Sequence, residues 1–425
     1  MKLSVIIPTR SRGRYLLSSI GSALVAADNS DCPVEIVISD NASEDNTHEI
    51  VNSFSDKRII YRKSLQRLSM RQNFEFALSN SSGSHVLFIG DDDAVAPHGL
   101  WLLKKILEET DADAVKWRVV NYIWPDPETG KPGNLNLRIQ KVAASRSAID
   151  PQKLLKRICS GRFRSYQEGV MIYHGCVSRR LIDRVRKHHG GPYFWCVCPD
   201  VYAAMQNIMM AKTPVQKIDL PITIGGESPA STGASAVRER YGLVKESSTT
   251  VRQFVCEYED DPYQGKLGPD HPSMTLHMLD CLQTASKVLD VPLDIDKRQW
   301  QKKSVSEISS FSPEFQQKCK EPLNDLLAFE SPLVIPHSNV PRKKIYREKK
   351  QPAHLDFKDL KIRIQPFKLI FSGGSETANS MSAAKLLDEI LDIRRFCSSS
   401  GVSWTPFIWR FLEIHRRAIK YQHSR

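Results

Sequence analysis

Short apolar runs alternate with segments of helical spacing along the N-terminal half of the chain. Apolar runs bounded by turn residues are typical of strands, and apolar positions three and four residues apart are typical of helices. The expected strands are Leu3–Ile7, Val34–Ser39, Arg58–Tyr61, His85–Ile89, Ala114–Ile123, Val170–Val177 and Ile218–Ile224. The expected helices are Tyr15–Ala27, Thr47–Phe54, Met70–Asn80, Pro97–Leu107, Pro151–Ile158, Leu181–His188 and Val201–Met210. This alternation predicts an α/β fold in which helices flank a mostly parallel sheet.

Changes in composition divide the chain. Residues 125–150 are rich in Pro, Gly, Asn and basic residues, which predicts a long loop. Beyond about residue 240 the pattern becomes mainly helical, and residues 332–354 combine prolines with basic residues. We therefore expect a first domain at 1–238 with halves at about 1–124 and 150–238, a helical extension at 239–331, a basic linker at 332–354, and a basic, mainly helical C-terminal region at 355–425.

Composition and charge narrow the class of protein. The 425 residues are 41% hydrophobic and 25% charged, which is typical of a globular protein with more than one domain. The net charge of +12 is concentrated in residues 341–425, where 18 Lys and Arg face 8 Asp and Glu. The sequence has no apolar run of membrane-spanning length, no signal-peptide pattern at its start, and nine cysteines without disulfide-framework spacing. A cytoplasmic protein is expected.

Three adjacent aspartates, Asp91, Asp92 and Asp93, directly follow the apolar run Val86–Ile89. Repulsion among them is costly unless a cation lies between their oxygens, and a divalent ion is the usual solution. Ligands of open α/β sheets bind at the carboxyl ends of strands, which is where this cluster falls. The alternative is a solvated acidic turn that caps the following helix.

Three other polar segments lie at comparable positions. The basic loop Pro8–Arg14 after the first strand suits a diphosphate-bearing ligand, although a solvated loop has the same composition. Asp40 ends the second strand, where it either accepts a hydrogen bond from a nucleotide base or caps the next helix. Asp200 begins a helix, where it either acts as a general base or stabilises the helix N-terminus.

Together these segments resemble the family 2 glycosyltransferases, which have the Rossmann-like GT-A fold. The resemblance covers about residues 1–235 and rests on three motifs: Ser4-Val5-Ile6-Ile7-Pro8-Thr9, Glu35-Ile36-Val37-Ile38-Ser39-Asp40-Asn41-Ala42-Ser43, and Phe88-Ile89-Gly90-Asp91-Asp92-Asp93 followed by Pro97. It implies a nucleotide-sugar half at about 1–124 and an acceptor half at about 150–238. Pro199-Asp200 resembles the position of the family's catalytic base.

The resemblance implies a role for each motif residue. The residues expected to contact the nucleotide-sugar are Pro8, Thr9, Arg10, Arg14, Asp40, Arg71 and Asp91. Asp40 is expected to read the base, and Asp91 to lie near the ribose. Asp92 is expected to bind Mn²⁺ or Mg²⁺, with Asp93 as a second ligand or a supporting group. The common family motif has an acidic residue where Gly90 stands, and the loop 227–232 lacks the histidine that many relatives place there.

The implied activity is an inverting, metal-dependent transfer of a sugar to a hydroxyl group. The resemblance implies a nucleotide-diphospho-sugar donor, most often a UDP-sugar, and a glycan or lipid-linked glycan acceptor in surface polysaccharide synthesis. Asp200 is expected to deprotonate the acceptor. Two alternatives stay open: a catalytically inactive sugar-nucleotide-binding or scaffold protein, and a nucleotidyltransferase. The second lacks support from a Gly-rich phosphate loop with its lysine near the first strand.

The C-terminal segment Trp404–Ile419 interleaves aromatic and aliphatic residues with arginines. This composition is compatible with peripheral contact at the anionic inner face of a plasma membrane, where lipid-linked acceptors are displayed. The alternative is a helix that packs back on the body of the protein with its basic face exposed. Nucleic acid is not an expected partner, because no binding motif accompanies the charge.

Overall fold

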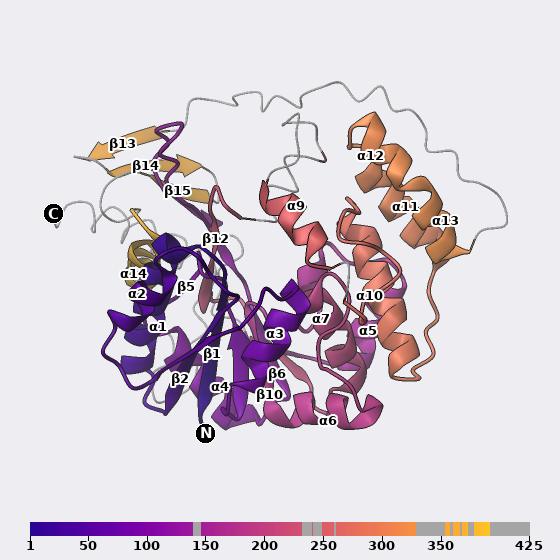
Figure 1. Cartoon of the computed structure of the whole chain (residues 1–425), viewed down its shortest axis with the longest axis horizontal. Helices are drawn as coiled ribbons and strands as arrows, with labels where there is room; N and C mark the ends of the chain where they lie inside the picture. The colour runs from indigo at the N-terminus through magenta and orange to yellow at the C-terminus, as the bar shows by residue number, and fades with distance from the viewer. Residues whose placement is uncertain are drawn as a thin grey trace.

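The computed structural model describes residues 1–138, 146–231, 240, 249–258, 261–328, 353–357, 360–365, 368–372 and 378–391. Its centre is a sheet with helices on both faces, and a second sheet and a group of helices lie on either side of the upper edge of this body in Figure 1. The α/β class with a largely parallel N-terminal sheet is confirmed.

The first sheet has the strand order β3-β2-β1-β4-β10-β6-β11-β9. Its strands are β1 (Leu3–Thr9), β2 (Val34–Asp40), β3 (Ile59–Lys63), β4 (His85–Phe88), β6 (Ala114–Trp117), β9 (Arg146–Ile149), β10 (Gly175–Ser178) and β11 (Val215–Ile218). Strands β1 to β4 run parallel, whereas β10 is antiparallel to both of its neighbours. The strand order reverses between β1 and β4, which is the switch point where open sheets bind ligands.

Helices cover both faces of this sheet. The N-terminal helices are α1 (Gly13–Asp28), α2 (Thr47–Asn52), α3 (Met70–Ser79), α4 (Gly99–Thr110), α5 (Pro151–Cys159), α6 (Arg179–His189) and α7 (Pro199–Met210). Alternate residues of β1 enter two different cores: Leu3, Val5 and Ile7 pack with α1 and α4, while Ile6 packs with α3 and α7. This alternation follows from the two-residue repeat of a strand, and apolar residues on both faces keep the strand fully buried.

Two expected strands each divide into two. The segment 114–123 forms β6 and then β7 (Val120–Ile123), and the segment 218–224 ends β11 and begins β12 (Thr223–Glu227). In both cases the chain leaves the first sheet and enters a second one, with the order β13-β14-β15-β8-β7-β12-β5, in which β5 is Ala94–Val95. The prediction of one long loop at 125–150 is wrong in part, because this segment contains β8 (Asn134–Arg138) and β9. Polar residues on these strands lie on faces that the rest of the protein covers only partly, so their composition resembles that of a loop.

The mainly helical region expected after residue 238 is present as α9 (Thr249–Cys256), α10 (Met274–Val288), α11 (Lys297–Ile308), α12 (Pro313–Lys318), α13 (Lys320–Leu327) and α14 (Ser380–Leu391). Three strands were not predicted there: β13 (Ala353–Phe357), β14 (Leu360–Gln365) and β15 (Lys368–Ser372). Their pairing with β8 extends the second sheet. The two-residue alternation of Leu360–Gln365 is the signal that marks a strand of this kind. The segment Trp404–Ile419 lies outside the described residues.

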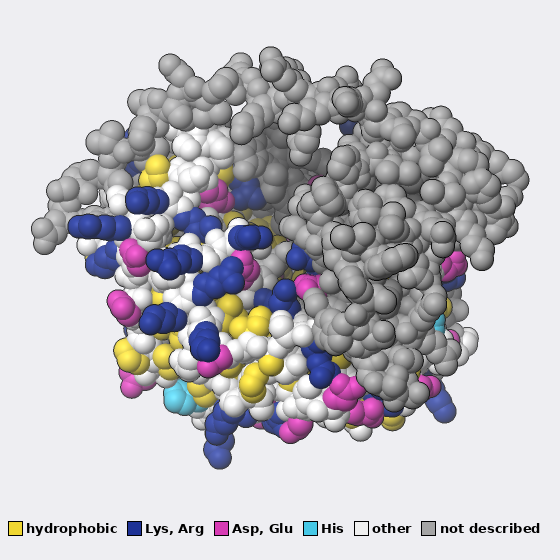
Figure 2. All heavy atoms as spheres, turned by 180° about the vertical axis from the view of Figure 1, so that it is seen from behind, with side chains coloured by type: hydrophobic (Ala, Val, Ile, Leu, Met, Phe, Trp, Pro, Cys, Tyr) yellow, Lys and Arg dark blue, Asp and Glu magenta, His cyan; other side chains and the backbone are white. Residues whose placement is uncertain are grey.

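The described surface is mixed in character. Figure 2 shows Lys and Arg side chains interspersed with Asp and Glu side chains, and hydrophobic side chains in small groups. The large hydrophobic side chains that are exposed are Met1, Leu17, Leu65 and Ile123. Among the helices of the described residues, none has the length and apolar character needed to cross a membrane.

A buried carboxylate joins the amino ends of the central strands. Glu35 of β2 is 2% exposed and accepts hydrogen bonds from the Ser4 hydroxyl (2.6 Å), the Ser82 hydroxyl (2.7 Å) and the Gly83 N–H (3.1 Å). It also pairs with Lys2. Burial alone would raise the pKa of Glu35, but the hydrogen bonds from Lys2, Ser4 and Ser82 outweigh it and lower the pKa to about 2.

We expect Glu35→Gln to lower the free energy of unfolding by about 1–3 kcal/mol at pH 7, because the charge-assisted hydrogen bonds are lost. The lowered pKa means that Glu35 stabilises the wild type above its ordinary value of 4.5, and that this contribution is lost as the pH falls toward 2. Urea unfolding across this pH range measures both effects, with the exposed Glu128→Gln as control. A gap between wild type and Glu35→Gln that stays constant from pH 6 to pH 3 would contradict this account.

Candidate active site

A cleft of about 930 Å³ opens at the carboxyl ends of β1 and β4. Its walls include Pro8, Thr9 and Arg10 after β1, the three aspartates after β4, and Asp200 at the start of α7. The cleft is also lined by Lys116, Trp117, Tyr166, Gln167 and Met171. The aspartate triplet and the expected base thus line one cleft at the switch point of the sheet.

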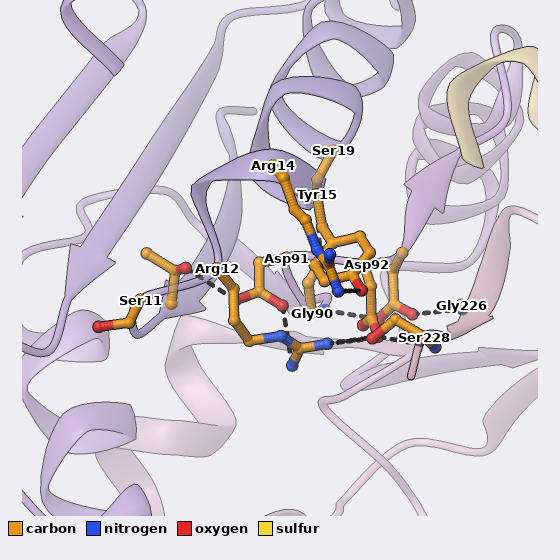
Figure 3. A network of polar contacts seen from close by, with 12 residues as sticks. Ser11, Arg12, Arg14, Tyr15, Ser19, Gly90, Asp91, Asp92, Gly226 and Ser228 are labelled. Atoms are coloured by element: carbon orange, nitrogen blue, oxygen red, sulfur yellow. Dashed lines mark hydrogen bonds and ion pairs between the residues drawn. The ribbon is translucent and has the colours of Figure 1, made fainter. Parts of the chain in front are cut away.

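Arg12 lies between the first two aspartates, as Figure 3 shows. Its Nη1 is 3.1 Å from Asp91 Oδ1, and its Nη2 is 2.6 Å from Asp92 Oδ2. The Thr9 hydroxyl donates to the other oxygen of Asp91 (2.7 Å), and the Ser228 hydroxyl donates to Asp92 Oδ2 (2.7 Å). One guanidinium therefore neutralises two nearly buried carboxylates.

Ionisation of Asp91 and Asp92 remains unfavourable despite the charge of Arg12. Burial raises the pKa of Asp91 to about 7, with the Arg12 charge acting in the opposite direction and the Asp92 charge adding to the rise. Burial and the neighbouring Asp93 also raise the pKa of Asp92, again against Arg12. Such carboxylates gain strongly from a cation, because a positive charge favours their ionised form.

Asp93 has a different environment. Its Oδ1 accepts from the Gly226 N–H (2.7 Å), and its Oδ2 accepts from the Tyr173 hydroxyl (2.7 Å) and the Gly90 N–H and lies 3.2 Å from His174 Nε2. Burial would raise the pKa of Asp93, but His174 and these N–H groups lower it. Asp93 is held by these donors, whereas Arg12 pairs with Asp91 and Asp92, so Asp93 fits the supporting role rather than that of a direct metal ligand.

The same contacts explain why glycine occupies position 90. A Cβ atom there would lie 2.6 Å from the Tyr173 hydroxyl, 3.0 Å from Asp93 Oδ2 and 3.2 Å from Asp92 Oδ1. The acidic residue that the common family motif has at this position would also add a fourth negative charge. Gly90 is therefore coupled to the presence of Tyr173, eighty-three positions further along the chain.

The end of β12 and the loop after it line the cleft next to the aspartates. Two groups contact the Asp92 carbonyl: Trp124 Nε1 donates to it (2.8 Å), and the backbone of Gly226 lies so near that a Cβ there would be 1.8 Å from the carbonyl oxygen. Gly225, Gly226, Glu227, Ala230 and Ser231 line the cleft. The loop 227–232 thus contacts the aspartates through Ser228, while Thr232 lies outside the described residues.

Asp200 stands in the first turn of α7. Burial raises its pKa above the ordinary value of 3.8, and the N–H groups of Val201 and Asp200 and the nearby His174 act in the opposite direction. His174 thus lies close enough to influence both Asp93 and Asp200. A carboxylate with a raised pKa is a stronger base than an ordinary aspartate, which suits deprotonation of a hydroxyl group.

Arg10 reaches a helix that sequence reasoning did not connect with the site. It pairs with Glu257 and donates to Gln253 Oε1 (3.3 Å) in and just after α9. Gln253, Phe254 and Glu257 also line the cleft. No local motif identified them, because their place in the site depends on a contact across almost 250 residues.

Asp40 and Arg14 lie outside the cleft lining. Asp40 is 0% exposed, and its two oxygens accept from the Tyr61 hydroxyl (2.6 Å) and the Ser43 N–H (2.8 Å). Arg14 is exposed and stacks over the Tyr15 ring, with the guanidinium carbon 4.5 Å from the ring centre. The base-reading role of Asp40 and the nucleotide role of Arg14 stay predictions.

Arg71 has a structural partner in place of the expected donor contact. Its Nε lies 2.8 Å and 2.7 Å from the two oxygens of Asp261, and both side chains are buried. The Ser69 hydroxyl also donates to Asp261, and the Arg71 guanidinium lies 5.0 Å from the Tyr263 ring centre. The ion pair of Arg71 therefore connects α3 to the segment after α9. Arg71 is not among the residues that line the cleft.

The donor set fits a divalent ion in part. Within the described residues, no group of three or more His, Cys, Asp or Glu side chains is arranged to hold a metal. Two carboxylates, those of Asp91 and Asp92, do converge on one cationic group. Mg²⁺ and related ions need only one or two carboxylates when substrate phosphates supply the remaining oxygens.

Comparison with known proteins identifies the N-terminal region. Residues 4–177 match the family described as glycosyl transferase family 2. The abequosyltransferase RfbV of Salmonella typhimurium is 31% identical over 138 residues, which is 29% of this chain and 41% of that protein. The glycosyltransferase GlyG of Streptococcus pneumoniae is 26% identical over 28% of this chain and 40% of its own length. The chain thus spans about two fifths of the curated relatives it matches.

Solved structures with a similar arrangement share little sequence. Staphylococcus aureus TarS 1–349 in complex with UDP-GlcNAc is 18% identical with a TM-score of 0.43, covering 77% of this chain and 86% of that one. The mannosyltransferase PcManGT of Pyrobaculum calidifontis in complex with GDP-Man and Mn²⁺ is 14% identical with a TM-score of 0.37, covering 77% and 84%.

We expect Arg71→Met to lower the free energy of unfolding by about 3–5 kcal/mol, because it leaves Asp261 buried without its cation. The double variant Arg71→Met/Asp261→Leu is expected to recover part of this loss. Urea unfolding of the two singles and the double measures the coupling, and the exposed Arg62→Met is the matched control. A stable Arg71→Met that has lost nucleotide binding would instead favour the donor contact expected from sequence.

Proposed function

We propose that this chain, whose residues 4–177 match the glycosyl transferase family 2, moves a sugar from a nucleotide-diphospho-sugar to a hydroxyl group of an acceptor. The observation that carries the proposal is the shared cleft: the aspartate cluster and Asp200 line it together at the switch point of the sheet. A filled cleft, as expected of a catalytically inactive scaffold, would have separated them.

The donor would bind at the β1 and β4 ends of the cleft. Thr9 and Asp91 are hydrogen-bonded there, and the guanidinium groups of Arg10, Arg12 and Arg67 line the same side. Planar guanidinium groups bind phosphate oxygens in pairs, so three of them suit a diphosphate. A UDP-sugar is the donor that the family resemblance favours.

Asp92, the metal ligand expected from the sequence, would hold the Mn²⁺ or Mg²⁺ ion. Asp91, which the sequence analysis assigned to the ribose, would share this role because both carboxylates face Arg12, and Asp93 would support the backbone at Gly90 and Gly226. A bound divalent ion neutralises the charge that develops on the leaving diphosphate. Arg10, Arg12 and Arg67 contribute to the same neutralisation from this chain. The nearly complete burial of Asp91 and Asp92 strengthens these electrostatic interactions, because the surrounding dielectric is low.

Asp200 would act as the base. It takes the proton of the acceptor hydroxyl while that oxygen forms a bond to the anomeric carbon, and the bond from this carbon to the diphosphate oxygen breaks with its electron pair leaving on the diphosphate. A single displacement of this kind inverts the anomeric configuration. Lys116 holds the backbone of another segment that lines the cleft, since its ammonium group donates to the carbonyls of Gln167 (3.1 Å) and Gly169 (2.9 Å).

The acceptor would enter beside Trp117, Tyr166 and Met171, which line the same cleft as Asp200, and Tyr166 lies near enough to Asp200 to feel its charge. Aromatic and apolar side chains with a few polar groups suit a glycan or the sugar of a lipid-linked glycan. The similarity to the abequosyltransferase RfbV supports a role in making a surface glycan. Peripheral membrane contact through the C-terminal region is a further part of this proposal.

Hydrolysis of UDP-, GDP-, CMP- and dTDP-sugars with Mn²⁺ or Mg²⁺ tests the activity without knowledge of the acceptor. We expect one donor to be hydrolysed, and Asp92→Ala to reduce the rate about 100-fold or more, because several kcal/mol of charge stabilisation are lost. The exposed Asp183→Ala is the matched control.

If none of the nucleotide-sugars is hydrolysed and no nucleotide binds in a metal-dependent way, the result would favour the inactive sugar-nucleotide-binding or scaffold protein. Release of pyrophosphate from a nucleoside triphosphate and a sugar phosphate would instead favour the nucleotidyltransferase.

Asp200→Asn separates catalysis from donor binding. We expect transfer to fall roughly 10²–10⁴-fold, while nucleotide affinity changes little, because the amide cannot take up the acceptor proton. In the wild type, the raised pKa of Asp200 places the acidic limb of kcat/KM above pH 3.8, with activity falling as the pH drops through that pKa and Asp200 becomes protonated. A rate unchanged by Asp200→Asn, with Asp183→Asn as control, would move the base to another residue.

A further inference from the structure

We propose that Arg12 takes the place of the metal ion in the ligand-free protein, where its guanidinium pairs with Asp91 and Asp92. When the donor and the metal bind, the guanidinium leaves these carboxylates and pairs with the diphosphate of the donor. The exchange would make the metal and the nucleotide diphosphate bind cooperatively. The inference rests on the proposed function, because it takes the diphosphate as the group that receives Arg12.

The contacts of Arg12 are those expected of a substitute for a metal ion. Its two terminal nitrogens lie 3.1 Å from Asp91 and 2.6 Å from Asp92, and Nη2 also donates to the Ser228 hydroxyl (2.6 Å). The side chains of Asp91 and Asp92 are 3% and 7% exposed. Solvent therefore supplies little of their neutralisation, and Arg12 supplies the only positive charge that lies within ion-pair distance of them among the described residues.

A divalent ion and Arg12 would compete for the same oxygens. Two like charges at the separation of neighbouring ligands repel each other strongly in a buried site. Metal entry therefore requires Arg12 to give up at least one of its two carboxylates. When the metal binds without nucleotide, part of its binding free energy is used to displace Arg12 from the two carboxylates. The ligand-free protein is therefore expected to bind the metal weakly.

Arg12 also has the means to serve the diphosphate. Its buried Nε has no hydrogen-bond partner among the described residues, so one donor of the group is still unused. The guanidinium lines the same cleft as Arg10, and it also lies 5.4 Å from the Tyr15 ring centre. Arg12 itself precedes α1 and is the last residue before its first turn. A donor diphosphate would satisfy the unused N–H and receive the charge.

Cooperativity follows from the exchange by linkage. If the diphosphate draws Arg12 away from the aspartates, it tightens metal binding, and the metal must tighten diphosphate binding by the same factor. Removing the Arg12 charge removes the competitor. A variant without this charge is then expected to bind the metal well on its own.

Titration of Mn²⁺ alone, followed by the loss of the free-ion electron paramagnetic resonance signal, tests the exchange without nucleotide or turnover. We expect Arg12→Gln to bind Mn²⁺ about 10-fold more tightly than the wild type, within the range common for coupled sites. Arg12→Lys keeps a positive charge and is expected to stay closer to the wild type. The exposed Arg62→Gln removes an equal charge from β3 and should leave the Mn²⁺ affinity unchanged.

Thermal unfolding of each variant establishes that it is folded, and Arg12→Ala, which also lacks the charge, carries the comparison if Arg12→Gln does not fold. Equal Mn²⁺ affinity in the wild type, Arg12→Gln and Arg12→Lys would overturn the proposal, as would no Mn²⁺ binding by any of them. An equal gain in Arg62→Gln would also overturn it, since the effect would then come from net charge. Because no donor is present, these failures are distinct from a silent hydrolysis panel.

Discussion

Three carboxylates at the end of one buried strand need compensation within the protein, and the architecture around the cleft depends on this constraint. Asp91 and Asp92 share the Arg12 guanidinium, whereas Asp93 is surrounded by hydrogen-bond donors. The difference divides the cluster into two carboxylates that face a movable cation and one that fixes the loop. A site that handles a charged leaving group needs both, because the ligands must respond to substrate while their support stays rigid.

The donors around Asp93 come from segments that are distant in sequence. Tyr173 precedes β10, Gly226 lies in β12, and the Ser380 hydroxyl of α14 donates to the Asp93 carbonyl (3.0 Å). Two sheets and a C-terminal helix therefore meet at one residue. The two changes of sheet contribute to this arrangement, because the strand after β6 leads to Trp124 at the Asp92 carbonyl and the strand after β11 carries Gly226.

Local patterns in the sequence were sufficient to predict β1 to β4, the position of the aspartates at a strand end, and the helix that carries Asp200. They were not sufficient for contacts set by tertiary structure. The family resemblance assigned Arg71 to the nucleotide-sugar, whereas its partner in the structure is Asp261, nearly two hundred residues away. Arg12 lies within the predicted basic loop, but nothing local distinguishes it from Arg10 and Arg14 as the residue that reaches the aspartates.

Calorimetric titration of the wild-type protein with UDP, GDP and dTDP, each with and without Mn²⁺, measures whether the cleft is a metal-dependent site for a nucleoside diphosphate. We expect one of these nucleotides to bind and Mn²⁺ to tighten its binding, since the ion and the arginines neutralise the same phosphates. If no nucleotide binds at millimolar concentration with Mn²⁺ present, the cleft is not such a site.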